Sequence, residues 1–184
     1  INGERAVRAR SDIDLFNVNG GLADCEKEEF GHSTSYCGIA GWRNPRDIEF
    51  VYTTPETWYS PRLKVDRITL NDGRASVYMQ QPGWKILQAN AWHQDTGYAP
   101  MYIENAYELL DEPGEWYLDK SAGYIYYMLQ ENQSVSNIDA EVPLLEELLN
   151  ISGTEENPVC GVEFDGITFA GTTYLRPETG NGHI

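Results

Sequence analysis

The chain has 184 residues, of which 41% are hydrophobic and 12% aromatic, so it is too apolar to be disordered. Its formal net charge of −16 repels phosphate backbones and polyuronic acids. Nucleic acid and pectin-type polyanions are therefore disfavoured as partners, whereas a neutral sugar polymer is compatible. The simpler role of this charge is solubility. No apolar run is long enough to span a bilayer.

Residues 1–46 contain little regular pattern, and we expect a loop-rich N-terminal segment. Arg5, Arg8 and Arg10 alternate with small apolar residues in a short candidate strand. A solvated strand edge explains these arginines more simply than contact with an anion or a partner. From residue 20 to residue 41 the composition predicts a long exposed loop.

The three cysteines do not form a metal-binding pattern. Cys25 and Cys37 flank a segment rich in Gly, Ser and Thr, which fits a disulfide across a loop and two free thiols equally well. Cys160 lies among valines, and we expect it to be a small buried hydrophobe. The sequence has no Cys-x-x-Cys or His-x-x-x-His spacing and no complete calcium or phosphate loop. We therefore expect no metal and no cofactor.

Polar and apolar residues alternate in the middle of the chain, which predicts an antiparallel β-sandwich or small barrel over residues 47–100. Residues 62–70 alternate with a phase slip at Asp66, and this slip predicts a β-bulge. Asn71-Asp72-Gly73 predicts a tight hairpin turn, because Asp and Gly tolerate positive φ angles. Residues 75–80 form the predicted return strand.

Residues 85–101 are predicted to form a loop in which aromatic and polar side chains are mixed. Sugar rings stack on Trp and Tyr, while sugar hydroxyls need fixed polar partners. This mixture predicts substrate contacts for Trp84, Trp92, His93 and Tyr98. Trp92 has the least regular surroundings and is the best candidate for an exposed platform. For Trp84 the alternative is burial in the core of the β-domain.

The last part of the chain, residues 101–184, mixes helical and extended patterns. Apolar residues from Ile103 to Leu110 fall at helical spacing and predict a short helix. Residues 116–119 and 123–129 are rich in strand formers and predict a hairpin. Residues 143–149 fit one or two helical turns by periodicity, although Leu145, Leu149 and Ile151 also suit the inward positions of an extended coil.

Two of these segments resemble a motif pair of secreted right-handed parallel β-helix proteins, which are pectin-lyase-like glycoside hydrolases. The segments are Gly114-Glu115-Trp116-Tyr117-Leu118-Asp119 and Phe164-Asp165-Gly166-Ile167-Thr168-Phe169. The resemblance extends over roughly residues 47–176. It implies a mostly β fold in which an antiparallel β-domain is inserted near the first coils of a parallel β-helix. In such proteins the inserted domain can pack over the β-helix and help to wall the substrate groove.

The resemblance implies a secreted or cell-surface glycoside hydrolase that acts on a neutral glycan, with this piece supplying scaffold and groove wall. The expected partners are an oligo- or polysaccharide and the remainder of the same β-helix protein. The alternative is a non-catalytic carbohydrate-binding or adhesin-like β-module. The chain starts at Ile1 and ends after a coil-like segment has begun, so we expect a piece of a longer protein.

Glycoside hydrolysis needs two carboxyl groups, one of them an acid with a raised pKa. The chain has 29 acidic residues, so their number discriminates nothing. Glu104, Glu115 and Asp165 have apolar or aromatic neighbours, which could raise the pKa of a carboxyl group. Each also has a simpler explanation: Glu104 fits a helix start, Glu115 a strand start and Asp165 a turn. In β-helix glycosidases the acid pair lies on later coils, so the resemblance assigns no catalytic residue to this chain.

Overall fold

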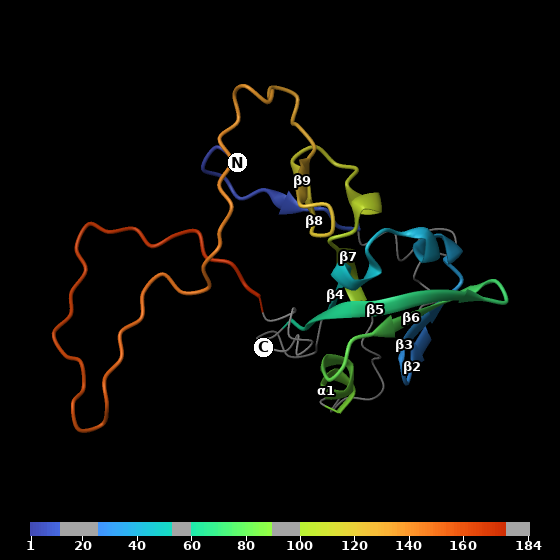
Figure 1. Ribbon diagram of the computed structural model, residues 1–184, viewed down its shortest axis with the longest axis horizontal. Coiled ribbons are helices and arrows are strands. Elements are labelled where there is room, and N and C mark those ends of the chain that lie inside the picture. The colour runs from blue at the N-terminus through green and yellow to red at the C-terminus, as the bar shows by residue number, and fades with distance from the viewer. Residues whose placement is uncertain (12–25, 53–59, 90–99, 176–184) are drawn as a thin grey trace.

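The computed structural model describes residues 1–11, 26–52, 60–89 and 100–175, which form a mostly β fold (Figure 1). Six strands form a curled sheet in the order β2-β3-β6-β5-β4-β7. Its strands are β2 (Glu26–Glu28), β3 (Gly31–Thr34), β4 (Glu49–Tyr52), β5 (Arg62–Asn71), β6 (Arg74–Met79) and β7 (Pro100–Glu104). The three-stranded sheet has the order β1-β8-β9, with the bounds β1 (Val7–Arg8), β8 (Glu115–Asp119) and β9 (Tyr124–Tyr127).

The helical elements are short and lie between the strands. Within the described ranges they are α1 (Gly83–Ala89) and the 3₁₀ helices η3 (Cys37–Gly41), η4 (Pro45–Asp47) and η5 (Tyr107–Leu109). In the part of the chain that the structure describes, no helix has the length and apolar character needed to cross a membrane.

The long strand β5 joins the two halves of the six-stranded sheet. Its first residues pair with β4 and the rest pair with β6. The register between β5 and β6 shifts between Val65 and Arg67, which confirms the predicted bulge. The turn that follows has Asp72 at φ 48° and Gly73 at φ 77°, as the Asn-Asp-Gly sequence predicts. This hairpin forms where local sequence predicts it.

The core lies on the apolar side of the curled sheet. Alternate residues of β4, β5 and β6 point into it, because side chains on a strand point to opposite faces in turn. The helix α1 covers this side with Trp84 and Leu87. The largest fully buried apolar side chains are Trp84, Tyr52, Tyr117, Phe50, Ile39, Ile48, Leu63, Leu87 and Ile103.

Residues 26–41 differ from the predicted exposed loop. They form β2, β3 and η3, and all four residues of β3 are buried. β3 pairs with β6 over its whole length. Gly31-His32-Ser33-Thr34 has neither alternation nor strong strand formers, so its burial depends on contacts that are distant in sequence. The loop prediction is wrong over these residues.

Two further predictions, for residues 85–101 and for Ile103 to Leu110, are wrong. Residues 83–89 form α1, although residues 85–101 were expected to be a loop. Ile103, placed in a predicted helix, lies in β7 and pairs with Phe50 of β4. Asn105 then has a φ of 60°, and only the short 3₁₀ helix η5 follows. The hairpin formed by β8 and β9, in contrast, confirms its prediction.

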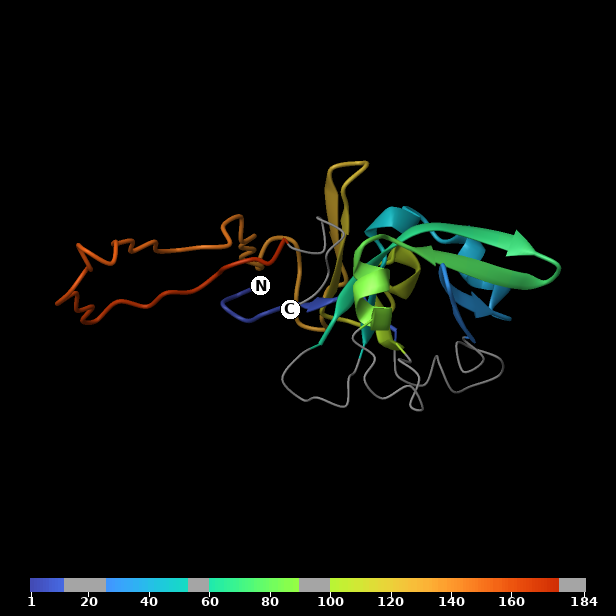
Figure 2. The same ribbon diagram turned by 90° about the horizontal axis from the view of Figure 1, so that it is seen from below.

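Residues 128–175 contain no helix or strand and extend away from the body of the fold (Figure 2). Most of their apolar side chains are exposed, and Cys160 is exposed rather than buried. The two ends of residues 145–173 meet, because the Thr173 amide donates to the Leu145 carbonyl at 2.9 Å. A parallel β-helix is not present in the described residues; an isolated coil would have no neighbour against which to bury its apolar side.

A buried histidine lies in the aromatic part of the core. His32 packs edge-on against Trp84 at 4.9 Å between ring centroids, and its Nε2 shares a hydrogen bond of 2.8 Å with the Tyr52 hydroxyl. Burial, and secondarily the positive charge of Lys27, lower the pKa of His32 from 6.5 to about 3, against a weaker opposing backbone hydrogen bond.

The depressed pKa of His32 makes the fold sensitive to acid. Between pH 6.5 and about 3 the unfolded chain binds a proton that the folded chain excludes, so stability falls as the pH falls through this window. His32 alone contributes a slope of up to about 1.4 kcal/mol per pH unit. Urea unfolding at several pH values measures this slope, and His32→Gln should reduce it. Equal slopes in the two proteins would contradict the assignment.

Gly31 is required by close packing in the β3–β6 pair. Its φ is +149°, and a Cβ would lie 2.2 Å from the Val77 carbonyl oxygen. Gly31→Ala should therefore lower the free energy of unfolding by roughly 2–3 kcal/mol or more. Gly41→Ala is the matched control, because a Cβ at Gly41 meets nothing within 4 Å. Urea titration of both variants checks this, and equal effects would argue against the close contact.

Candidate functional site

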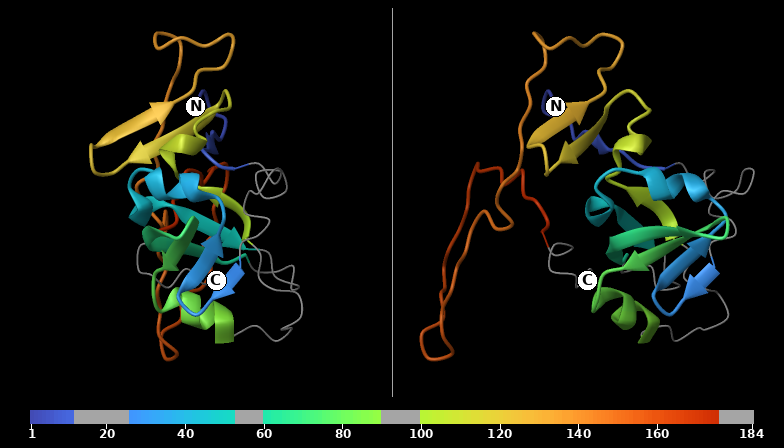
Figure 3. Two further views of the ribbon diagram at one scale, coloured as in Figure 1. Left: turned by 90° about the vertical axis from the view of Figure 1, so that its right-hand side faces the viewer. Right: turned by 45° about the vertical axis from the view of Figure 1, so that its right-hand side comes forward.

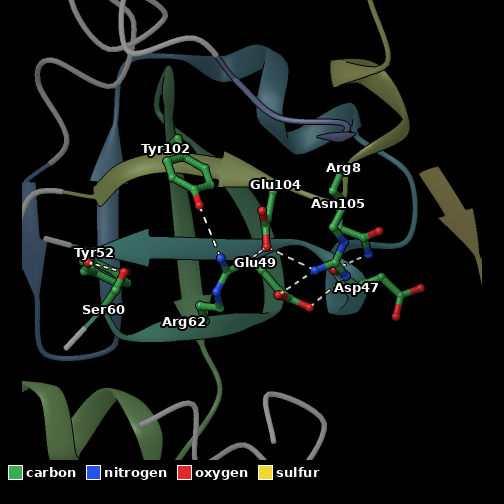
Figure 4. Close-up of polar contacts among 9 residues, drawn as sticks. All are labelled: Arg8, Asp47, Glu49, Tyr52, Ser60, Arg62, Tyr102, Glu104 and Asn105. Carbon is green, nitrogen blue, oxygen red and sulfur yellow. Dashed lines mark hydrogen bonds and ion pairs between the residues drawn. The ribbon is translucent and has the colours of Figure 1, made fainter. Parts of the chain in front are cut away.

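Two glutamates face each other on neighbouring strands of the six-stranded sheet (Figure 4). Glu49 of β4 is the cross-strand partner of Glu104 of β7, and their side chains are only 4% and 6% exposed. Arg8 of β1 lies across both. Its Nη1 donates to Glu49 Oε2 at 2.9 Å and to Glu104 Oε1 at 3.1 Å, and its Nη2 donates to Glu49 Oε1 at 3.0 Å. One guanidinium therefore bridges two buried carboxylates.

A second arginine completes this group. Arg62 of β5 forms an ion pair with Glu104 through Nη1, and its Nη2 lies 3.4 Å from the Tyr102 hydroxyl. The side chains of Arg8 and Arg62 are 24% and 32% exposed, so the arginines lie between the carboxylates and solvent. We call these four residues, Arg8, Glu49, Arg62 and Glu104, the charge cluster.

The position of β1 brings Arg8 to the carboxylates. The Ala9 amide donates to the Trp116 carbonyl of β8 at 2.8 Å, and the Asn105 amide donates to the Ala9 carbonyl, also at 2.8 Å. Asn105 also donates from its side chain to the Asp47 carbonyl at 2.7 Å. The N-terminal segment thus contacts both sheets, and the charge cluster lies where they meet.

The charge cluster is suited to holding strands together and unsuited to acid–base chemistry. Like charges placed directly opposite on neighbouring strands repel, so the facing glutamates require cations. Burial opposes the charged form of Arg8, but attraction and hydrogen bonds from both glutamates outweigh it and raise the pKa of Arg8. A catalytic carboxyl group must reach the scissile bond, whereas these two carboxylates accept hydrogen bonds from guanidinium groups that lie between them and solvent.

The role of Arg8 differs from the one that the sequence predicts. The alternating pattern predicts a solvated strand edge for Arg5, Arg8 and Arg10. The structure shows instead that Arg8 forms hydrogen-bonded ion pairs with two buried glutamates. No local signal indicates this role, because the partners lie 41 and 96 residues away.

Of the four predicted sugar contacts, the structure describes only Trp84. Trp92, His93 and Tyr98 lie outside the described residues. Trp84 is fully buried, and its indole N–H lies 2.9 Å from the Glu29 carbonyl and 3.3 Å from that of Glu28. The structure therefore places Trp84 in the core, which was the alternative for this residue, and leaves no face of its indole open to a sugar.

The remaining acidic candidates are Glu115 and Asp165. Glu115 accepts hydrogen bonds from the amides of Arg10, Asp111 and Glu112, each at 3.3 Å. Burial, the largest effect, raises the pKa of Glu115, although these backbone hydrogen bonds act against it. Asp165 is exposed and precedes Gly166, whose φ is 71°. In the described ranges, no three His, Cys, Asp or Glu side chains gather so that they could hold a metal ion.

Comparison with known proteins identifies the class of this fold. A solved structure named "Glycoside hydrolase" is similar to it, with a TM-score of 0.74 and 30% sequence identity. The match covers 97% of this chain and 31% of that chain, so the chain spans about a third of the length of this similar protein. The search of curated proteins found no match.

A protein-family comparison gives the particular family. Residues 1–130 match the GH141 insertion domain, and the chain therefore belongs to this family. The matched range includes both sheets and the whole charge cluster, and it ends shortly after β9. The residues that extend away from the body lie almost entirely beyond the match.

Removal of the bridging cation should destabilise the domain strongly. Arg8→Met leaves the two buried glutamates without this partner, which should lower the free energy of unfolding by roughly 3–5 kcal/mol. Arg46→Met is the control, because Arg46 is 75% exposed and its pair with Asp66 should contribute less than about 1 kcal/mol. Urea unfolding of both variants measures the difference. Similar losses in the two would contradict a special role for the charge cluster.

Proposed function

We propose that the chain is part of a secreted or cell-surface glycoside hydrolase that acts on a neutral glycan. In this proposal the domain supplies scaffold and part of the groove wall, and the catalytic carboxylates lie elsewhere in the polypeptide. Membership of the GH141 insertion domain family and the similar structure named "Glycoside hydrolase" support an enzyme of this class. Location outside the cell fits a polymeric substrate.

The observation that carries the non-catalytic role is the state of the facing glutamates. Glu49 and Glu104 are the kind of carboxylate pair from which glycosidases build an active site, yet Arg8 bridges them and Arg62 holds Glu104 as well. Their oxygens are engaged by guanidinium groups, so they are not free to contact a glycosidic bond. The pair therefore stabilises the domain that walls the groove.

Charge supports the choice of a neutral glycan. With 29 acidic and 13 basic residues, the chain repels a polyuronate at long range. Sugar hydroxyls, in contrast, bind through hydrogen bonds and aromatic stacking. Trp92, His93 and Tyr98 remain the predicted contacts for such a glycan.

Sugar release by the complete protein tests the division of roles. On a panel of neutral oligosaccharides, Glu49→Gln and Glu104→Gln should keep turnover within about threefold per mole of folded enzyme. Loss of a catalytic acid or base removes about 10²–10⁴-fold. A folded variant that lost turnover on that scale would place catalysis in the charge cluster and contradict the proposal.

The same panel separates the enzyme from a binding module. We expect the complete protein to release sugar and residues 1–184 alone to release none. If neither cleaves any sugar while tryptophan fluorescence shifts on glycan addition, the non-catalytic carbohydrate-binding role replaces the proposed one.

A further inference from the structure

The three-stranded sheet contains strands from near both ends of the range that matches the insertion domain family. β1 follows the first residues, and β9 precedes the segment that leaves the body. These two ends lie side by side (Figure 3), since the Asn2 amide donates to the Asp139 carbonyl and the Asp139 amide donates to Asn2 Oδ1, both at 2.7 Å. A domain inserted into another fold needs such adjacent ends.

The register of β8 and β9 gives this hairpin two different faces. Tyr117 pairs with Tyr126, and both pack edge-on against Tyr107, at 5.7 and 5.4 Å between ring centroids. This inner face joins the core. Trp116 pairs with Tyr127 on the opposite face. We call that face, formed by Trp116, Leu118, Ile125 and Tyr127, the outer face.

The outer face is apolar and does not belong to the core cluster. Ile125 is 49% exposed, and the other three members are half-buried. Its polar contacts lie at one end, where Arg8 is 5.8 Å from the Trp116 ring centroid and the Tyr127 hydroxyl donates to Gln133 Oε1 at 2.8 Å. Four adjacent apolar side chains on a small sheet indicate a surface that another layer covers.

We propose that the outer face docks onto the part of the same polypeptide into which this domain is inserted. The segment that follows the matched range leaves from this sheet, directly after β9, which favours a host fold next to it. The chain covers only 31% of the similar glycoside hydrolase, which leaves a large body available for contact. The residues that follow the matched range expose apolar side chains of their own, among them Leu144 and Ile167.

Docking of the outer face would fix the orientation of the domain relative to the host fold. A domain joined only by two chain connections can rotate, whereas burial of the outer face fixes its orientation. A groove wall must keep a fixed distance from the catalytic groups, because small displacements reduce catalysis. The inference rests on the proposed function only in placing the domain within a larger enzyme, and its test does not require turnover.

Thiol labelling of the complete protein tests whether the outer face is covered. Ile125→Cys is compared with Leu70→Cys, because Ile125 and Leu70 have similar exposure in this chain, 49% and 54%, and Leu70 lies at the far end of β5. Maleimide labelling is followed by peptide mass spectrometry, which separates the natural cysteines. We expect Ile125→Cys to react at least about tenfold more slowly without any sugar present. Equal rates would overturn the proposal.

A charged substitution provides an independent readout. Ile125→Asp should speed limited proteolysis between residues 131 and 141 of the complete protein about tenfold relative to Leu70→Asp, since it disrupts docking beside this connection. Equal cleavage rates would contradict the proposal. Protection of Ile125→Cys only on addition of a neutral oligosaccharide would also overturn it, because the outer face would then be a glycan site.

Discussion

Two buried carboxylates placed opposite each other are the constraint on which this domain depends. Glu49 and Glu104 are buried on the paired strands β4 and β7, where two like charges repel and each loses its hydration. Arg8 relieves this only when β1 pairs with β8 and the N-terminal segment crosses β7. The ion pairs therefore connect the position of the first strand to the pairing of strands that are far away in sequence.

The strand β4 contributes side chains both to the apolar core and to the charge cluster. Phe50 and Tyr52 point into the apolar core, while Glu49 points to the other face and meets Arg8. Replacing such an ion group by apolar side chains of similar volume is often neutral for stability. We infer that the charges contribute specificity, because the observed position of β1 places Arg8 against both glutamates.

The two sheets of the domain are joined through Arg8. The three-stranded sheet contains the first strand and the last hairpin of the family region, and Arg8 of the same sheet extends into the charge cluster. The buried ion pairs thus link the strands at the ends of the matched range to the six-stranded sheet. Such a link would suit the groove-wall role that we propose for the domain.

Sequence reasoning succeeded where structure is local. The bulge near Asp66, the turn at Asp72-Gly73 and the hairpin of β8 and β9 depend on neighbouring residues, and all three were predicted correctly. It failed where contacts between residues that are distant in sequence determine the secondary structure. Ile103 has helical spacing but joins β7, because Phe50 of β4 offers a strand partner 53 residues away in the sequence.

The candidate site shows the same limit. The acidic residues were too numerous to rank, and nothing near Arg8 indicates that its partners are Glu49 and Glu104. The fold class was correct in being mostly β and antiparallel, and the resemblance to a glycoside hydrolase family agrees with the comparisons. The parallel β-helix is not present in the described residues, since its coils stabilise one another only in a stack.

A double-mutant cycle between Arg8 and Glu104 tests the central claim most directly. Urea unfolding of the natural chain, Arg8→Met, Glu104→Gln and the double variant gives the coupling free energy between the two side chains. We predict a coupling of about 2 kcal/mol or more, because each single variant leaves a buried charge or donor without its partner. A coupling near zero would mean that the charge cluster does not hold the two sheets together, and the structural role assigned to the glutamates would be wrong.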